Sequence, residues 1–165
     1  MFTKLIKPEN LRKFSFKRPL VFTNGCFDVV HRGHVCLLRE AKSLGASLIL
    51  ALNSDESVKT LKGPARPLNK LEDRLFVLSE FESIDYLTWF GEDTPLKLIE
   101  IIKPDVLVKG GDWTIDKIVG GSFVESIGGK VFSLPFEVGY STSNIINRAR
   151  TFSKGGQDVP EPNNS

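Results

Sequence analysis

Short apolar runs that alternate with segments of helical periodicity are the feature that most constrains the fold of this chain. Buried strands are predicted at residues 20–24, 48–53, 86–90, 106–109 and 130–134. Helices are predicted at residues 34–44, 69–81, 94–103 and 123–127, with a last helix opening at residues 141–143. The Asn69 to Glu72 spacing resembles a capping box. This alternation predicts a Rossmann-like α/β fold: a doubly wound, mainly parallel sheet of about five strands with helices on both faces.

The length and composition indicate one domain. The chain has 165 residues, and its 41% hydrophobic content is enough for one core. We expect the domain to span residues 19–152, after a basic, partly helical lead-in at residues 1–18. Residues 153–165 have almost no apolar side chains, so we expect a disordered tail.

The distribution of charge argues against nucleic-acid and membrane partners. The 22 basic and 20 acidic residues are interspersed along the chain, without a long run of one sign. No stretch approaches the ~20 apolar residues of a membrane span, and the first residues lack the apolar core of a signal peptide. We therefore expect a cytoplasmic protein that binds anions only locally.

The chain's two histidines lie three residues apart, directly after the first predicted strand. In TNGCFDVVHRGH, Gly25 allows the backbone to approach a phosphate and Gly33 allows a sharp entry into the helix that follows. The free N–H groups of a helix start favour an anion, so His31 and His34 flank a predicted anion site. Ordinary capping and packing roles are the alternative for the pair. A zinc site that adds Cys26 and Cys36 fits none of the common ligand spacings, so no metal site is predicted.

The segment GCFDVVHRGH resembles the HxGH signature of the cytidylyltransferase-like nucleotidyltransferase superfamily. The segments NSDESVKTLKG, RPLNKLEDR, EDTP, LVKGGDW and STSNII follow in the family's order, so the resemblance covers residues 21–146. Together they resemble the heptose-1-phosphate adenylyltransferases in their standalone form. That resemblance implies ATP and a sugar 1-phosphate as substrates, Mg²⁺ as cofactor, a homodimer, and a product used for lipopolysaccharide.

The resemblance also implies functional residues. His31 and His34 would stabilise charge on the transferred α-phosphate, with Lys62 as a third catalytic residue. Lys62 is preferred to Lys59 because it borders Gly63, which would let a mobile loop close over the phosphates. The residues implied in nucleotide binding are Thr23, Asn24, Gly25, Phe27, Asp28, Gly33, Lys109, Gly111, Asp112, Ser141, Thr142 and Ser143. The residues implied in sugar-phosphate binding are Asn53, Asp55 and Arg74.

Several alternatives remain open at this stage. Arg66, Glu72 and Arg74 are equally suited to structural or interface roles. Several relatives have a basic residue where this chain has Ile146, so Lys62, Arg74, Mg²⁺ and, more weakly, Arg148 are candidates to balance the pyrophosphate. Cytidylyl transfer to a polyol phosphate such as glycerol 3-phosphate is the rival reaction. The alternative outside the enzymes is a nucleotide-sensing module that binds a nucleotide without catalysing a reaction.

Overall fold

One five-stranded parallel sheet forms the centre of the molecule, with the strand order β3-β2-β1-β4-β5. The structure is a computed structural model that describes residues 3–111, 113–135 and 140–155. The strands are β1 (Leu20–Gly25), β2 (Ser47–Asn53), β3 (Tyr86–Phe90), β4 (Val106–Gly110) and β5 (Lys130–Leu134). These bounds confirm the predicted fold class and the predicted strands.

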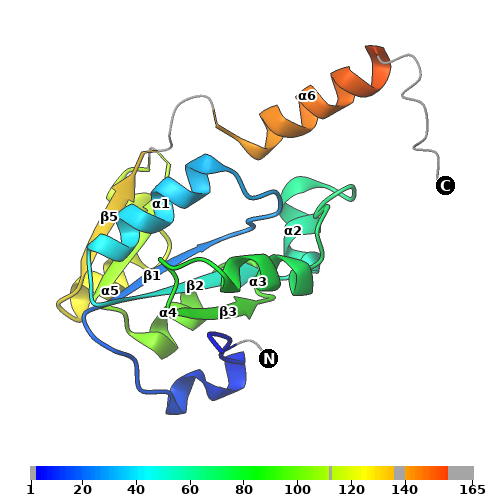
Figure 1. Cartoon of the computed structure of the whole chain (residues 1–165). Coiled ribbons are helices and arrows are strands. Elements are labelled where there is room, and N and C mark those ends of the chain that lie inside the picture. The colour runs from blue at the N-terminus through cyan, green and yellow to red at the C-terminus, as the bar shows by residue number, and fades with distance from the viewer. Residues whose placement is uncertain (1–2, 112, 136–139, 156–165) are drawn as a thin grey trace.

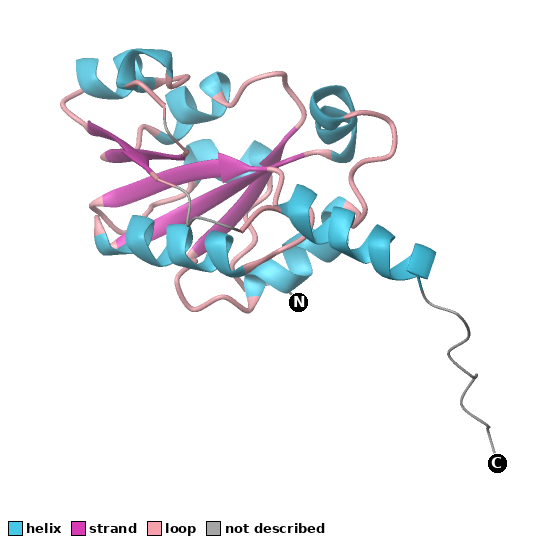
Figure 2. Cartoon of the chain, turned by 90° about the horizontal axis from the view of Figure 1, so that it is seen from above, coloured by secondary structure: helices cyan, strands magenta, loops and turns pink. Residues whose placement is uncertain are grey.

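Helices cover both faces of the sheet (Figures 1 and 2). On one face, α1 (Arg32–Ser43) and α3 (Leu71–Ser79) pack on side chains such as Val21 and Val108. On the other face, η1 (Pro8–Lys13), α4 (Leu96–Ile102) and α5 (Gly121–Ser126) pack on side chains such as Phe22 and Leu107. Because side chains alternate along a strand, each central strand contributes to two separate apolar clusters.

The strand order places a crevice at the carboxyl ends of β1 and β4. From β1 the chain passes through α1 to β2 on one side, and from β4 it passes through α5 to β5 on the other. The connections that leave these two neighbouring strands therefore diverge, which is the usual ligand position in a doubly wound sheet. Both loops that carry the predicted nucleotide residues begin at this crevice.

The first residues of the chain pack against the edge of the sheet. Leu5 forms an isolated bridge with Leu87, and Ile6 donates a backbone hydrogen bond of 2.8 Å to the carbonyl of Leu87. Leu11 of η1 is buried beside α4. The predicted lead-in is thus part of the packed fold over its described residues.

The last helix, α6 (Thr142–Gly155), projects away from the sheet (Figure 1). Its side chains are exposed from Ser143 to Phe152, except for Ile146, which is partly buried. Of the predicted tail, residues 153–155 continue α6, and residues 156–165 lie outside the described residues. In the part of the chain that the structure describes, no helix is long and apolar enough to cross a membrane.

Two local predictions are wrong. The expected loop around Lys59 and Lys62 is largely a helix, α2 (Asp55–Lys62), because the Ser54 hydroxyl caps it by accepting a 3.2 Å hydrogen bond from the N–H of Ser57. Gly63 ends α2 with φ 96°, a conformation that favours glycine. The predicted capping box is also absent: α3 begins at Leu71 after Lys70, which gives no side-chain cap.

Candidate active site

The loop between β1 and α1 has a strained, tightly packed backbone. Phe27 adopts φ 47°, a left-handed conformation that is uncommon for a residue with a side chain. Its buried ring lies under the loop, and a Cβ on Gly25 would come within 2.9 Å of that ring. Gly25 is therefore required sterically, because any side chain there would push Phe27 out of position. Strain of this kind is concentrated at functional sites.

His31 and His34 stack on each other at the start of α1. Their ring centroids are 3.9 Å apart with an interplanar angle of 30°, and the His34 ring also lies 4.6 Å from that of Phe27. His31 is the N-cap residue of α1, and its backbone N–H donates a 3.3 Å hydrogen bond to Nδ1 of His34. Because Nδ1 of His34 accepts this bond, a neutral His34 has its proton on Nε2.

Burial keeps both imidazoles neutral. Burial, and secondarily the neighbouring His31, lowers the pKa of His34 to about 4. Burial also lowers the pKa of His31. The Nδ1 atom of His31 is buried and lacks a hydrogen-bond partner among the described residues. At neutral pH the pair therefore presents uncharged N–H donors beside a helix start.

Gly33 lies between the two histidines and holds their geometry by its lack of a side chain. A Cβ at this position would lie 3.1 Å from the His31 ring and 3.4 Å from the Cβ of Tyr140. The 3.1 Å contact requires the His31 ring to shift by a few tenths of an ångström. The site therefore depends on glycine between the histidines for steric reasons.

Gly33→Ala is expected to lower kcat by about tenfold or more, because the new methyl group displaces His31. The same change should leave thermal stability unchanged or raise it, since alanine is favoured over glycine in a helix by up to about 1 kcal/mol. Steady-state kinetics tests the expected fall in kcat, and thermal unfolding of the same preparation tests the expected change in stability. Equal loss of activity and stability would contradict this explanation.

The Asp28 side chain fixes the next loop rather than facing a ligand. Its buried carboxylate accepts a 2.5 Å hydrogen bond from Nε of Arg66, and also accepts from the backbone N–H groups of Leu68 and Asn69. The Asn69 side chain donates in return to the Asp28 carbonyl at 2.6 Å. Because Asn69 is engaged here, it does not cap α3. The Asp28 side chain therefore supports the following loop, and the predicted contact of Asp28 with the nucleotide stays a prediction.

Arg74 of α3 connects the ends of the two central strands. Its side chain is fully buried and donates to the carbonyls of Cys26, Asn53 and Asn69 at 2.6–3.1 Å. It also donates to the Asp55 carboxylate at 2.7 Å. Four of its five N–H groups are donated within the protein, which favours the structural alternative, and its predicted contact with substrate stays a prediction.

The side chains of Asn53 and Asp55, which were predicted to bind substrate at the end of β2, also form hydrogen bonds within the protein. Asn53 is buried and donates to the Ser57 hydroxyl at 2.9 Å. Asp55 is 27% exposed, with one oxygen bound to Arg74. Of the two, Asp55 therefore retains the more accessible side chain for a sugar hydroxyl. That role stays a prediction.

The buried side chains of β1 and of the loop that follows it pack in the core beneath the backbone of the site. Thr23 is completely buried, and its hydroxyl has no partner among the described residues. The Thr23 and Phe27 side chains are both buried, and the predicted contact of these residues with the nucleotide stays a prediction. Asn24 and Gly25, at the carboxyl end of β1, are partly exposed and remain candidates.

The start of α6 is attached to the histidine loop. The Thr142 hydroxyl donates a 3.2 Å hydrogen bond to the Val29 carbonyl, and the Arg32 guanidinium lies 5.5 Å from the centre of the Tyr140 ring. Ser141 caps α6 by accepting a 3.1 Å hydrogen bond from the N–H of Asn144. Ser143 is exposed beside it. The structure therefore brings the start of α6 beside the start of α1.

The loop after β4 forms the other wall of the crevice. Gly111 is buried with φ 113°, and its N–H donates to the Leu134 carbonyl at 2.8 Å. Asp112, predicted to bind the nucleotide, lies outside the described residues. Trp113 is half exposed, and its indole N–H donates to the Gly110 carbonyl at 3.2 Å. Sequence reasoning did not select Trp113, although an exposed aromatic ring at a strand end suits base stacking.

The family follows from a match that covers most of the chain. Residues 22–148 match the cytidylyltransferase-like family, a segment that includes the histidine loop, α2, α3, the loop after β4 and the start of α6. The chain belongs to the cytidylyltransferase-like family. It is a nucleotidyltransferase.

The relatives and solved structures of this nucleotidyltransferase agree with the match. It is 55% identical over 130 residues to "Bifunctional protein HldE" of Marinomonas sp. and 52% identical over 131 residues to that of Hahella chejuensis. These segments are 79% of this chain, but they span only 27% and 28% of the relatives. The structure of a lipopolysaccharide core biosynthesis protein from Thermoplasma volcanium is 27% identical with TM-score 0.57, over 72% of this chain and 95% of that one. Pantothenate synthetase from Thermus thermophilus, 16% identical with TM-score 0.62 over 92% of this chain and 70% of that one, shares the fold.

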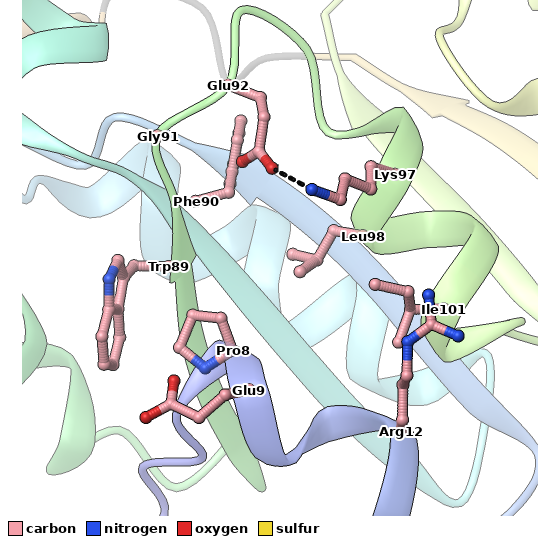
Figure 3. Close-up of a pocket in the computed structure, with 10 residues that line it drawn as sticks. All are labelled: Pro8, Glu9, Arg12, Trp89, Phe90, Gly91, Glu92, Lys97, Leu98 and Ile101. Atoms are coloured by element: carbon pink, nitrogen blue, oxygen red, sulfur yellow. Dashed lines mark ion pairs between the residues drawn. The ribbon is translucent and has the colours of Figure 1, made fainter.

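The nucleotidyltransferase has a separate cleft between η1, β3 and α4 (Figure 3). This cleft of about 340 Å³ has an apolar floor that includes Phe90, Leu98 and Ile101. Glu92 and Lys97 form an ion pair of 3.4 Å at its rim. None of the residues predicted for catalysis or binding lines it, so the histidine loop remains the better candidate for chemistry.

Proposed function

We propose that this nucleotidyltransferase transfers AMP from ATP to D-glycero-β-D-manno-heptose 1-phosphate, giving ADP-heptose and pyrophosphate. The observation that carries the proposal is the stacked pair of neutral histidines at the start of α1, beside the start of α6. The choice of heptose is supported by the motif order described above and by the names of the relatives. A homodimer remains part of the proposal.

The reaction needs no general base, because a sugar phosphate is already an anionic nucleophile at neutral pH. An oxygen of the acceptor phosphate attacks the α-phosphorus of ATP. The bond from that phosphorus to the oxygen bridging the β-phosphate then breaks, and pyrophosphate leaves with the electron pair. Catalysis consists of alignment and of stabilising the charge that spreads over the α-phosphate oxygens.

The protein groups suit these two tasks. The N–H groups at the start of α1, together with His31 and His34, are donors for the oxygens of the α-phosphate. A neutral Nε2–H on His34 keeps its proton through the reaction and strengthens its hydrogen bond as charge develops. The hydroxyls and N–H groups at the start of α6 are donors for the departing pyrophosphate.

Mg²⁺ belongs to the proposal as a companion of ATP. Within the described residues, no group of three or more His, Cys, Asp or Glu side chains can hold a metal ion. Mg²⁺ commonly binds the phosphates of a nucleotide and retains several waters. We therefore assign the ion to the triphosphate, where it would neutralise charge on the leaving group.

A substrate matrix tests the proposal. ATP with heptose 1-phosphate should exceed CTP with the same acceptor by at least about tenfold in kcat/KM, because a pocket fitted to adenine leaves polar groups of cytosine unpaired at ~1–3 kcal/mol each. Pyrophosphate release is measured for ATP and CTP, each with heptose 1-phosphate and with glycerol 3-phosphate.

The outcomes of this matrix separate the competing functions. If CTP with glycerol 3-phosphate is the fastest pair, the heptose proposal fails and cytidylyl transfer replaces it. If ATP binds tightly but no pair releases pyrophosphate, the nucleotide-sensing alternative replaces both reactions.

A further inference from the structure

The start of α6, where the proposed reaction places the departing pyrophosphate, has no basic side chain. Arg148 is the first basic residue of this helix, and it lies six residues beyond Thr142, ~9 Å along the helix axis. His31 and His34 do not supply the charge, because burial lowers the pKa of both imidazoles and leaves them neutral. A pyrophosphate with several negative charges therefore needs a cation from another element.

Three other cations near the crevice are directed elsewhere. The Arg32 guanidinium lies 5.5 Å from the centre of the Tyr140 ring. Arg74 donates four hydrogen bonds within the protein at 2.6–3.1 Å. Lys109 is the fourth residue of β4, and because side chains alternate along a strand, it leaves the sheet on the α4 side.

Arg66, in the loop between α2 and α3, is anchored beside the histidine loop by one of its five donors. Its Nε donates a 2.5 Å hydrogen bond to the buried carboxylate of Asp28. That carboxylate also accepts from the backbone N–H groups of Leu68 and Asn69, so its charge is shared among three donors.

The rest of the Arg66 guanidinium is available to a ligand. Within residues 3–111, 113–135 and 140–155, its terminal nitrogens Nη1 and Nη2 donate to no other residue. The side chain is 19% exposed, and neither terminal nitrogen is among the buried polar atoms without a partner. Arg66 is thus held in place while it presents a planar pair of donors, the arrangement that suits a phosphate.

The anchor at Asp28 places Arg66 beside the start of α6. The carbonyl of Val29, the next residue, accepts the 3.2 Å hydrogen bond from the Thr142 hydroxyl. Arg66 and the start of α6 are therefore attached to adjacent residues of one loop, whose Cα atoms are ~3.8 Å apart. An anion as large as pyrophosphate can contact both.

We propose that Arg66 binds the β- and γ-phosphates of the nucleotide through Nη1 and Nη2 and holds the pyrophosphate as it departs. The sequence left structural and interface roles open for Arg66, and this inference adds a direct contact with substrate. It rests on the proposed nucleotidyl transfer, but it does not depend on the base or on the acceptor. Since the breaking bond leaves its electron pair on the pyrophosphate, a cation here stabilises the transition state more than the ground state.

A comparison of triphosphate with monophosphate tests this contact directly. Titration calorimetry of the full chain in Mg²⁺ measures the binding of α,β-methylene-ATP and of AMP. Arg66→Met should weaken α,β-methylene-ATP by about 10- to 100-fold, the range expected for one hydrogen bond to a charged group. AMP should be affected less than about twofold, because it lacks the phosphates that Arg66 would contact. Arg39→Met, at an exposed arginine of α1, is the matched control and should change neither.

A second variant separates binding from folding. Arg66→Met leaves the buried Asp28 carboxylate without its cation, so its unfolding temperature should fall. Arg66→Lys keeps a charge beside Asp28 and should unfold near the temperature of the unsubstituted protein. It should still lose most of the affinity for α,β-methylene-ATP, because an ammonium bound to Asp28 has no planar pair of donors left for a phosphate.

Product inhibition gives a kinetic readout of the same contact. The inhibition constant of pyrophosphate should rise at least about tenfold in Arg66→Met, while KM for the acceptor stays within about twofold. A rise in KM confined to the acceptor would contradict the assignment.

Three binding results would also overturn the inference: unchanged affinity for α,β-methylene-ATP in Arg66→Met, an equal loss for α,β-methylene-ATP and AMP, or full affinity in Arg66→Lys. The second and third would make Arg66 a purely structural residue. Failure of the heptose proposal is distinguishable from these results. In that case no turnover occurs with heptose 1-phosphate and ATP, yet Arg66→Met still weakens triphosphate relative to monophosphate, with ATP and AMP or with CTP and CMP.

Discussion

His34→Ala should lower kcat by at least about a hundredfold and leave the protein folded at the assay temperature. One donor to a developing oxyanion is worth ~2.7–4 kcal/mol, or about 10²–10³ in kcat. His34 is such a donor because its Nδ1 atom already accepts from the backbone of His31, which leaves Nε2–H for the substrate. Pyrophosphate release at saturating ATP and acceptor measures the effect.

The pH profile provides a second readout of the same assignment. Because burial and His31 lower the pKa of His34 to about 4, the imidazole is neutral throughout pH 6–8. The kcat/KM of the unsubstituted enzyme, which reports ionisations of the free enzyme, should therefore show no histidine titration near pH 6.5. A histidine that worked as a charged imidazolium would give a kcat/KM that falls as pH rises through that value.

Matched variants separate catalysis from folding. His31→Ala should also cost about a hundredfold, and the double variant should lose less than the product of the single losses if the stacked rings act as a unit. Arg39→Ala, at an exposed position of the same helix, should keep full activity. Unfolding of either histidine variant at the assay temperature would instead indicate that the histidines are structural.

The sheet and the order of its helices and strands were accessible from sequence because they depend on periodicity. Apolar runs such as residues 48–53 are long enough, and separated widely enough, to indicate parallel strands with helical crossovers. Glycines beside histidines likewise indicated an anion site after the first strand. The structure retains that arrangement, with His31 capping α1 and His34 one turn inside it.

The interactions that support the site were not accessible, because they join residues distant in sequence. The Asp28 carboxylate is bound by donors from residues 66–69, so its role depends on a tertiary contact that spacing cannot show. The same contact removes Asn69 from its predicted role as a helix cap. The helix α2 differs, because its Ser54 cap and acidic first turn are local signals, but lysines beside Gly63 are also typical of a phosphate-binding loop.

Arg74 shows most clearly how a charged residue in a functional motif can be structural. A lysine or arginine beside a predicted phosphate site is readily interpreted as a ligand, and Arg74 is predicted from the sequence as a substrate residue. Its burial favours a structural role, since it satisfies the carbonyls at the ends of β1 and β2. Those strand ends carry the loops of the active site, so Arg74 acts on the site through the backbone.

Arg74→Met should therefore reduce the free energy of unfolding by about 2–6 kcal/mol, because two backbone carbonyls lose their donor at ~1–3 kcal/mol each. The change leaves the buried carbonyls of Cys26 and Asn53 without donors and Asp55 without its cation. Asp55→Asn is the matched comparison and should cost less, because an amide oxygen at this position can still accept from Arg74 and the carbonyl contacts of Arg74 remain. Urea unfolding of the three proteins measures these differences. If Arg74→Met lost less than about 1 kcal/mol while KM for the acceptor rose steeply, Arg74 would be a substrate ligand after all.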